Sequence, residues 1–129
     1  MRFSENEYPQ QELTKRIIAA GVEVHRELGP GFVEKIYENA LASELLRRGH
    51  KVDRQVVVRV GYRGEVVGEH RIDLMVDDSV VVELKTVDAL AEVHKAQLRS
   101  TLKAAGKQVG LLINFNRPTL TEGVRRVIN

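Results

Sequence analysis

Apolar side chains recur at steps of three and four over the first part of the chain, which is the spacing of amphipathic helices. Residues 11–28 follow this spacing, and the segment GPG at residues 29–31 ends it, which predicts a first helix. The spacing restarts at Val33 and closes on two arginines and a glycine at residues 47–49, which predicts a second helix. The chain is therefore expected to open with two helices.

Beyond residue 50 the spacing of apolar side chains changes to two, which is the period of a β-strand. This alternation and the turn residues between its runs predict three strands, over residues 51–61, 66–76 and 80–86. A third helix over residues 87–106 and a fourth strand over residues 108–115 are expected to follow. The last run is almost wholly apolar, as is typical of a strand covered on both faces. We expect one α/β domain over residues 1–129, with a loose segment at 1–10 and a tail at 117–129.

Composition narrows the functional classes. The chain has 129 residues, 43% of them hydrophobic and 29% charged, which suits one globular domain with its own core. It has no cysteine, so disulfides and thiolate metal sites are excluded and oxygen ligands remain for a metal. The N-terminus is polar and no apolar run approaches the ~20 residues of a membrane span, so we expect a cytoplasmic protein without a membrane partner. The net charge of +2 favours a polyanionic partner only weakly.

Three charged residues interrupt the second and third predicted strands: Asp73, Glu83 and Lys85. If the hairpin is symmetric about Asp78, Asp73 faces Glu83 with Cβ atoms ~5 Å apart, and Lys85 shares their face. The apolar residues of both strands are then expected on the opposite face, namely Ile72, Leu74, Val76, Val80, Val82 and Leu84.

Two carboxylates this close resist full ionisation unless a cation lies between them. Hard divalent ions such as Mg²⁺ take carboxylate oxygens and keep several waters, so Asp73 and Glu83 are candidate metal ligands. The alternative is that both acids are exposed strand residues, with Lys85 as their ion-pair partner. The three residues alone do not decide between a metal site and a charged patch.

Basic side chains on two segments are candidates for phosphate contacts, and the alternative is a solvated surface in both cases. A projection at 100° per residue places Gln97 on the sheet-facing side of the third helix and the lysines and arginine on the other side. A glutamine there would either order a water or phosphate or bond strand backbone. The expected nucleic-acid-binding residues are Lys95, Arg99 and Lys103 on the third helix, and Arg47 and Arg48 at the end of the second.

The segments GFVEKIYENAL, RIDLMVDDSVVVELK and HKAQL, in this order, resemble the GxxExxY family of the PD-(D/E)xK nuclease superfamily over about residues 10–116. The resemblance implies a restriction-endonuclease-like αβββαβ core with a mixed central sheet flanked by helices, plus an extra N-terminal helix. Thr101 departs from the family, since many relatives are expected to carry tyrosine there.

The resemblance also implies roles for single residues. Asp73 and Glu83 would bind the metal, Glu34 would complete its environment, and Lys85 would assist the attacking water. Gln97 matches a glutamine that recurs in several branches of the superfamily. The implied catalytic residues are therefore Glu34, Asp73, Glu83, Lys85 and Gln97.

The function expected from these observations is hydrolysis of phosphodiester bonds in nucleic acid, above all DNA, with Mg²⁺ or Mn²⁺ as cofactor and a metal-bound water as nucleophile. The alternative is a non-catalytic module that keeps the nuclease fold and binds nucleic acid or a protein partner. A homodimer is one option for the oligomeric state, because small nucleases often need a second copy to span a duplex.

Overall fold

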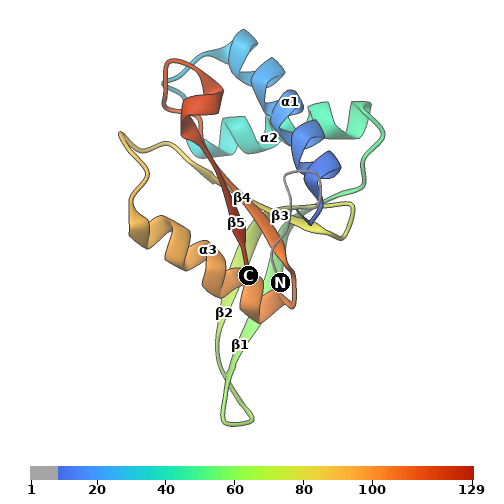
Figure 1. Ribbon diagram of the computed structural model, residues 1–129, viewed down its shortest axis with the longest axis vertical. Coiled ribbons are helices and arrows are strands. Elements are labelled where there is room, and N and C mark those ends of the chain that lie inside the picture. The colour runs from blue at the N-terminus through green and yellow to red at the C-terminus, as the bar shows by residue number, and fades with distance from the viewer. Residues whose placement is uncertain (1–8) are drawn as a thin grey trace.

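The computed structural model describes residues 9–129 and arranges them as a five-stranded sheet with helices on both faces (Figure 1). Residues 1–8, most of the segment expected to be loose, lie outside the described residues. The elements in chain order are α1 (Gln11–Leu28), α2 (Glu34–Arg47), β1 (Val52–Tyr62), β2 (Glu65–Val76), β3 (Val80–Lys85), α3 (Glu92–Ala105), β4 (Val109–Asn114), the 3-10 helix η1 (Leu120–Gly123) and β5 (Val124–Ile128).

The sheet is mixed and follows the order of the strands in the chain. Strands β1, β2 and β3 pair antiparallel, β3 and β4 pair parallel, and β5 returns antiparallel to β4. A parallel pair needs a crossover connection, and α3 provides it between β3 and β4. The expected α/β fold with a mixed sheet and an extra N-terminal helix is confirmed.

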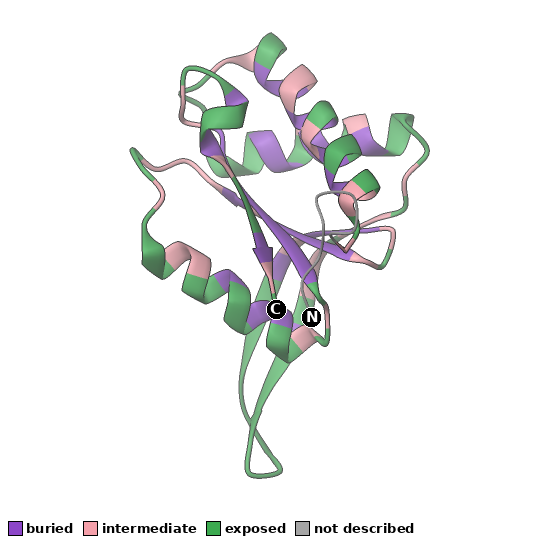
Figure 2. Ribbon diagram, in the orientation of Figure 1, coloured by how far each residue is buried: buried purple, intermediate pink, exposed green. Residues whose placement is uncertain are grey.

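Two layers of core side chains hold the helices on opposite faces of the sheet (Figure 2). Ile17 of α1 and Leu41 of α2 belong to the cluster on one face, and Leu98 and Leu102 of α3 belong to the cluster on the other. All four side chains are at most 1% exposed. No helix within residues 9–129 is long and apolar enough to span a membrane.

The register of the β2–β3 hairpin is the one expected from symmetry about Asp78. Val76 pairs with Val80 and Leu74 with Val82. Placing Ile72 on the same face as Leu74 was wrong, since Ile72 packs in the cluster under α3. The reason is a local irregularity: the pairing with β3 stops at Leu74, and Gln55 on the neighbouring strand has a left-handed backbone with φ of 51°.

Two expected boundaries change in the structure. The tail predicted over residues 117–129 is wrong: it forms η1 and β5, because the apolar side chains of Leu120 and Val127 are buried. The third helix begins at Glu92 instead of Val87. The Asn114 side chain accepts a hydrogen bond from the backbone N–H of Val87 and donates one to the backbone carbonyl oxygen of Val87. These two bonds hold the backbone at Val87 away from helical geometry.

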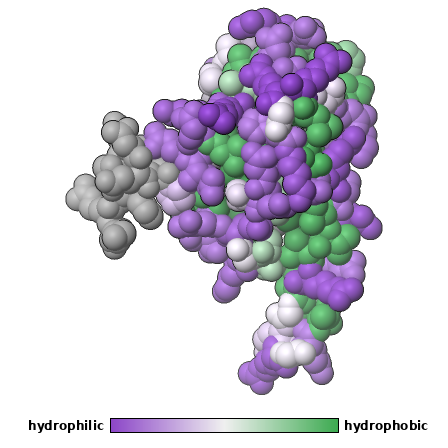
Figure 3. Space-filling model, turned by 90° about the vertical axis from the view of Figure 1, so that its right-hand side faces the viewer, coloured by the Kyte–Doolittle hydropathy of each residue, from purple (hydrophilic) through white to green (hydrophobic). Residues whose placement is uncertain are grey.

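The outer part of the β1–β2 hairpin, residues 57–70, projects beyond the rest of the sheet, and we call it the arm (Figure 1). β3 pairs with β2 only from Leu74 onward, so the arm is a two-stranded ribbon. Several of its large apolar side chains are exposed, and Figure 3 shows apolar surface continuing from the body of the molecule onto it. A two-stranded hairpin is marginally stable alone, so contacts along the arm matter for its order.

Gly123 is expected to be essential for the packing of η1 against β4. A Cβ atom on Gly123 would lie 2.2 Å from the carbonyl oxygen of Asn114. Gly123→Ala should therefore lower the free energy of unfolding by about 1–3 kcal/mol, as overpacking does elsewhere. Chemical denaturation measures this loss. Gly68→Ala is the matched control, because a Cβ atom on Gly68 meets nothing within 4 Å; equal stability of the two variants would contradict the prediction.

Candidate active site

The site begins where β2 and β3 separate. Asp73 directly precedes Leu74, the first residue of β2 that pairs with β3, and its Oδ2 accepts a hydrogen bond of 2.8 Å from the backbone N–H of Leu84 in β3. The carboxylate thus takes the place of a backbone carbonyl in the sheet. This contact holds Asp73 beside Glu83, so the structure brings the two acids together as the alternation of the strands predicted.

Glu83 is a buried carboxylate with an unsatisfied oxygen. Its side chain is 13% exposed, and its buried Oε1 has no hydrogen-bond partner among the described residues. Burial and, to a smaller extent, the neighbouring carboxylate of Asp73 together raise the pKa of Glu83 to about 8. The positive charge of Lys85 acts in the opposite direction and lowers this pKa. Nε2 of His70 lies 3.6 Å from Oε1, too far for a hydrogen bond. A buried carboxylate oxygen without a hydrogen bond, beside a second carboxylate, is costly for the fold.

Lys85 lies at the end of β3 and lines a small cavity with Glu83. Among the residues that the structure describes, Lys85 forms no ion pair, so it is not the close partner of the acids that a charged patch would require. Its charge nevertheless lowers the pKa of both Glu83 and Glu34. Lys85 is therefore a cation aimed at the site and free to act on another group.

The cavity has a volume of about 30 Å³, which is room for one or two water-sized groups. Its lining comes from β2, β3, β4 and α3: His70, Glu83, Lys85, His94, Gln97, Leu98, Thr101 and Leu112. Gln97 faces the cavity as predicted, although the residue is exposed and not buried. Thr101 is buried and donates a hydrogen bond to the Gln97 carbonyl oxygen, so it packs the helix in place of a tyrosine.

Glu34 reaches the edge of the site from α2. It is the first residue of that helix and remains exposed. Partial burial raises the pKa of Glu34, the charge of Asp73 raises it as well, and Lys85 together with a backbone hydrogen bond from Thr86 lowers it. These effects place Glu34 within electrostatic reach of both residues, although Glu34 does not line the cavity.

A family model described as the PD-(D/E)XK nuclease superfamily matches residues 11–127. The chain belongs to this superfamily. The crystal structure of SSO0001 is similar to it, with a TM-score of 0.58 and 20% sequence identity, and the match covers 93% of this chain and 59% of that chain. This chain therefore spans about three fifths of SSO0001, and a likeness at this identity supports the fold. No curated protein matches the chain.

Nucleases of this superfamily generally use divalent metals, and the carboxylates present fit such an ion. Glu83 has a buried oxygen without a hydrogen-bond partner among residues 9–129, and burial together with the neighbouring Asp73 carboxylate raises the pKa of Glu83 to about 8. Within residues 9–129 no three His, Asp or Glu side chains converge as a ready cage. Two carboxylates with water in the other positions are nevertheless a sufficient protein contribution for Mg²⁺.

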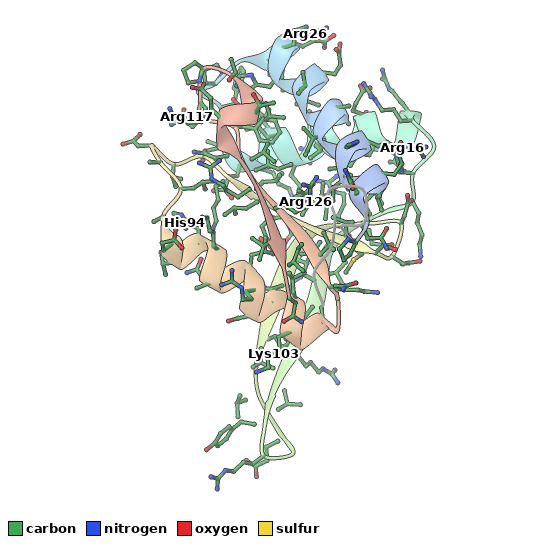
Figure 4. All side chains as sticks on the ribbon, viewed as in Figure 1. Arg16, Arg26, His94, Lys103, Arg117 and Arg126 are labelled. Carbon is green, nitrogen blue, oxygen red and sulfur yellow. The ribbon has the colours of Figure 1, made fainter. Side chains whose placement is uncertain are left out.

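The basic residues expected to bind nucleic acid fall into two separate places. Lys103 lies on the exposed side of α3, well along the helix from His94 at its first turn (Figure 4). Arg47 ends α2, and Glu34 begins it, so about 20 Å of helix separates the arginine from the site. Arg48 pairs with Glu44 at 2.8 Å. The residues of α3 are therefore better placed than Arg47 and Arg48 to contact a substrate that occupies the site.

Sequence reasoning missed a buried network that links α2 to Asp73. Glu38 is 4% exposed, and its carboxylate accepts hydrogen bonds from Arg54 at 2.7 and 3.0 Å and from Gln55 at 2.6 Å. The same Gln55 amide group lies 3.5 Å from Oδ1 of Asp73. His70 at the cavity was missed as well. In the sequence, the network is indicated only by Glu38, which follows Tyr37, and an acid at this position is equally typical of a surface residue.

Arg54→Ala is expected to destabilise the protein by about 2 kcal/mol, because it leaves Glu38 buried without its main partner. Burial raises the pKa of Glu38, but hydrogen bonds, above all those from Arg54, lower it by more, so the pKa lies below 4.5 in the folded protein. The ionised Glu38 therefore stabilises the fold above pH 4.5, and this stabilisation is lost as the pH falls through the lowered pKa. Urea unfolding at pH 7 and pH 4 measures both effects. Arg48→Ala is the control, because its partner Glu44 is more exposed; equal losses would refute the role of Arg54.

Proposed function

We propose that this protein is a divalent-metal-dependent nuclease of the GxxExxY family that hydrolyses phosphodiester bonds in DNA. The observation that carries the proposal is the orphaned oxygen of Glu83, buried beside Asp73 and next to a cation that has no ion-pair partner among the described residues. A stable structural pair would have left neither group unsatisfied. The arrangement suits a site that gains its missing charges from a metal and a phosphate.

Each residue of the site has a role that follows from its position. Asp73 and Glu83 would hold a Mg²⁺ or Mn²⁺ ion, and Glu34 would add negative charge at its edge. The ion would supply Lewis-acid stabilisation of charge at phosphorus. Lys85 lines the cavity and orients a water there, or takes its proton when the lysine is in its uncharged form. Gln97 lines the same cavity and is placed to bond that water or a phosphate oxygen.

The direct test combines a metal titration with a cleavage assay. Calorimetry would follow Mg²⁺ and Mn²⁺ binding to the wild type and to Asp73→Asn, and labelled single- and double-stranded DNA would report cleavage by both. Asp53→Asn is the matched control, since Asp53 pairs with Lys51 at 3.7 Å on β1. We expect binding and cleavage in the wild type and the control, and loss of both in Asp73→Asn.

Two results would argue against the proposal. Metal binding without cleavage of any DNA or RNA would favour a module that binds nucleic acid and keeps the nuclease fold. Absence of metal binding at millimolar concentration would leave Asp73 and Glu83 as a destabilising acid pair without a catalytic role.

A further inference from the structure

A groove opens between α3 and the arm, beside the catalytic cavity. Its volume is about 530 Å³, and its walls are Val60 on the arm and Val93, Ala96, Ser100 and Ala104 on α3. None of the residues that line it is acidic, basic or aromatic except His70. The groove is therefore much larger than the catalytic cavity and largely apolar.

The groove and the catalytic cavity adjoin and share part of their lining. His70, Gln97 and Thr101 line both of them, and the cavity beyond holds Glu83 and Lys85. A substrate with a phosphodiester at Glu83 and Lys85 would therefore extend directly into the groove. The part of the substrate next to the bond to be cut meets apolar wall there.

The wall on α3 is built from small side chains at helical spacing. Ala96, Ser100 and Ala104 recur every four residues, and all three are exposed. From Val93 to Ala104 the helix runs about 17 Å, which is long enough for a few nucleotides of a single strand. The side chains on this wall are uncharged, so it suits the faces of bases and sugars better than phosphates.

Cations border the groove along its outer edge. Ala96 and Ser100 also line a shallow surface formed with Arg99 and Lys103. Figure 4 shows Lys103 on the part of α3 that lies nearest the arm. A strand lying along α3 would thus place phosphates against Arg99 and Lys103 and its bases in the groove, which is the charge complementarity that single-strand binding requires.

The arm adds an aromatic side chain to this arrangement. Tyr62 lies two residues beyond Val60 in β1, past a register shift between Val60 and Gly61. The Tyr62 side chain is exposed, at 61%, and the Arg63 guanidinium lies 5.4 Å from the centre of its ring, so the two side chains offer an aromatic and cationic surface to a base beyond the groove. Paired bases of a duplex have no free faces for such contacts.

We propose that this groove binds the unpaired bases of a single-stranded nucleic acid adjacent to the scissile phosphate. The proposal rests on the proposed nuclease function and names its substrate class. It also gives a use to the exposed apolar wall of α3 and to the adjoining face of the arm. The preference for single strands comes from the groove and not from the metal site.

Binding can be measured separately from cleavage. Fluorescence anisotropy in metal-free buffer would compare a labelled 12-nucleotide single-stranded DNA with the same sequence as a duplex, for the wild type, Ser100→Glu and Ala104→Glu. Ala19→Glu is the matched control, because Ala19 is an exposed alanine on α1. We expect the wild type and the control to bind the single strand at least tenfold more tightly than the duplex. The groove variants should lose at least tenfold in affinity for the single strand alone.

The proposal would be overturned if the wild type bound both DNAs with equal affinity, or if the groove variants bound like the wild type. It would also be overturned if the groove variants lost equal affinity for the single strand and the duplex, because a long-range charge effect would produce that result. Hydrolysis of bis(p-nitrophenyl) phosphate by the wild type with Mn²⁺ tests the nuclease function by itself. Hydrolysis without single-strand preference refutes the groove alone. Preference without any hydrolysis refutes the nuclease and leaves the groove as a binding site.

Discussion

Glu83→Gln is expected to abolish DNA cleavage, by at least a thousandfold, while making the metal-free protein more stable at neutral pH. The loss of activity follows because Glu83 supplies one of the two carboxylates that would hold the ion. The gain in stability follows because burial and Asp73 raise the pKa of Glu83 to about 8, so its ionised form is disfavoured in the folded state. Glutamine has nearly the same shape and no charge to desolvate.

The sign of the stability effect depends on pH in a defined way. Below pH 4.5 the glutamate is protonated in both the unfolded and the folded protein, so the variant and the wild type should be similar. Between pH 4.5 and 8 the unfolded state releases a proton that the folded state keeps, so the wild type loses stability as the pH rises. Glutamine avoids this loss, and the advantage of the variant at pH 7 should reach about 2–3 kcal/mol.

Thermal unfolding in EDTA from pH 4 to 8, with a parallel cleavage assay, measures both effects. Glu27→Gln is the matched control, because Glu27 is exposed on α1, and it should leave stability and cleavage unchanged. Added Mn²⁺ should stabilise the wild type and not Glu83→Gln, since an ion that binds only the folded state raises its stability. A Glu83→Gln variant that is less stable than the wild type at pH 7 would show that the carboxylate is satisfied in the native protein.

The opposing trends in activity and stability describe how the site is built. Asp73 is tied to the Leu84 N–H, so it cannot turn away from Glu83. Arg54 and Gln55 fix the position of Glu38, and Gln55 in turn reaches Asp73. The sheet therefore holds two carboxyl groups together although the ionisation of both is disfavoured there. Residues held in this way, against their electrostatic preference, are typical of functional sites.

The fold was largely predictable because its signals are local. The period of two in β2 and β3 and the turn around Asp78 were enough to place Leu74 opposite Val82, and hence Asp73 beside Glu83. The strand β5 was not predicted, because its five residues alternate poorly and its apolar side chains are recognisable only once β4 lies beside them. The same limit explains the misplaced Ile72, since the irregularity beside Gln55 has no sequence signature.

The site was predictable only where its residues share a hairpin. Asp73, Glu83 and Lys85 lie within thirteen residues of one another, and strand geometry alone relates them. His70 also lies on β2, but its distance from Glu83 depends on how that strand bends past Asp73. Glu38 needed the packing of α2 on the sheet, which periodicity does not specify. Tertiary contacts of this kind lie outside what a single sequence conveys.

Lys85→Ala is expected to lower kcat for DNA cleavage by about a hundredfold to ten-thousandfold, which is the range for a general acid or base. Binding of Mn²⁺ should be kept, because the ligands Asp73 and Glu83 remain and a neighbouring positive charge is removed. Single-turnover cleavage and calorimetry measure the two quantities. Lys15→Ala, an exposed lysine on α1, is the control and should change neither.

The outcome separates two roles for this lysine. A residue that positions or deprotonates the water affects kcat, and its removal should displace the rise of kcat with pH, since the group that takes the proton has changed. A lysine that only neutralises the acids would instead change metal affinity and the free energy of unfolding. Lys85 forms no ion pair with the described residues and lines the cavity beside Glu83, so we expect the first pattern. A Lys85→Ala variant with full kcat and altered metal affinity would assign the proton transfer to another group.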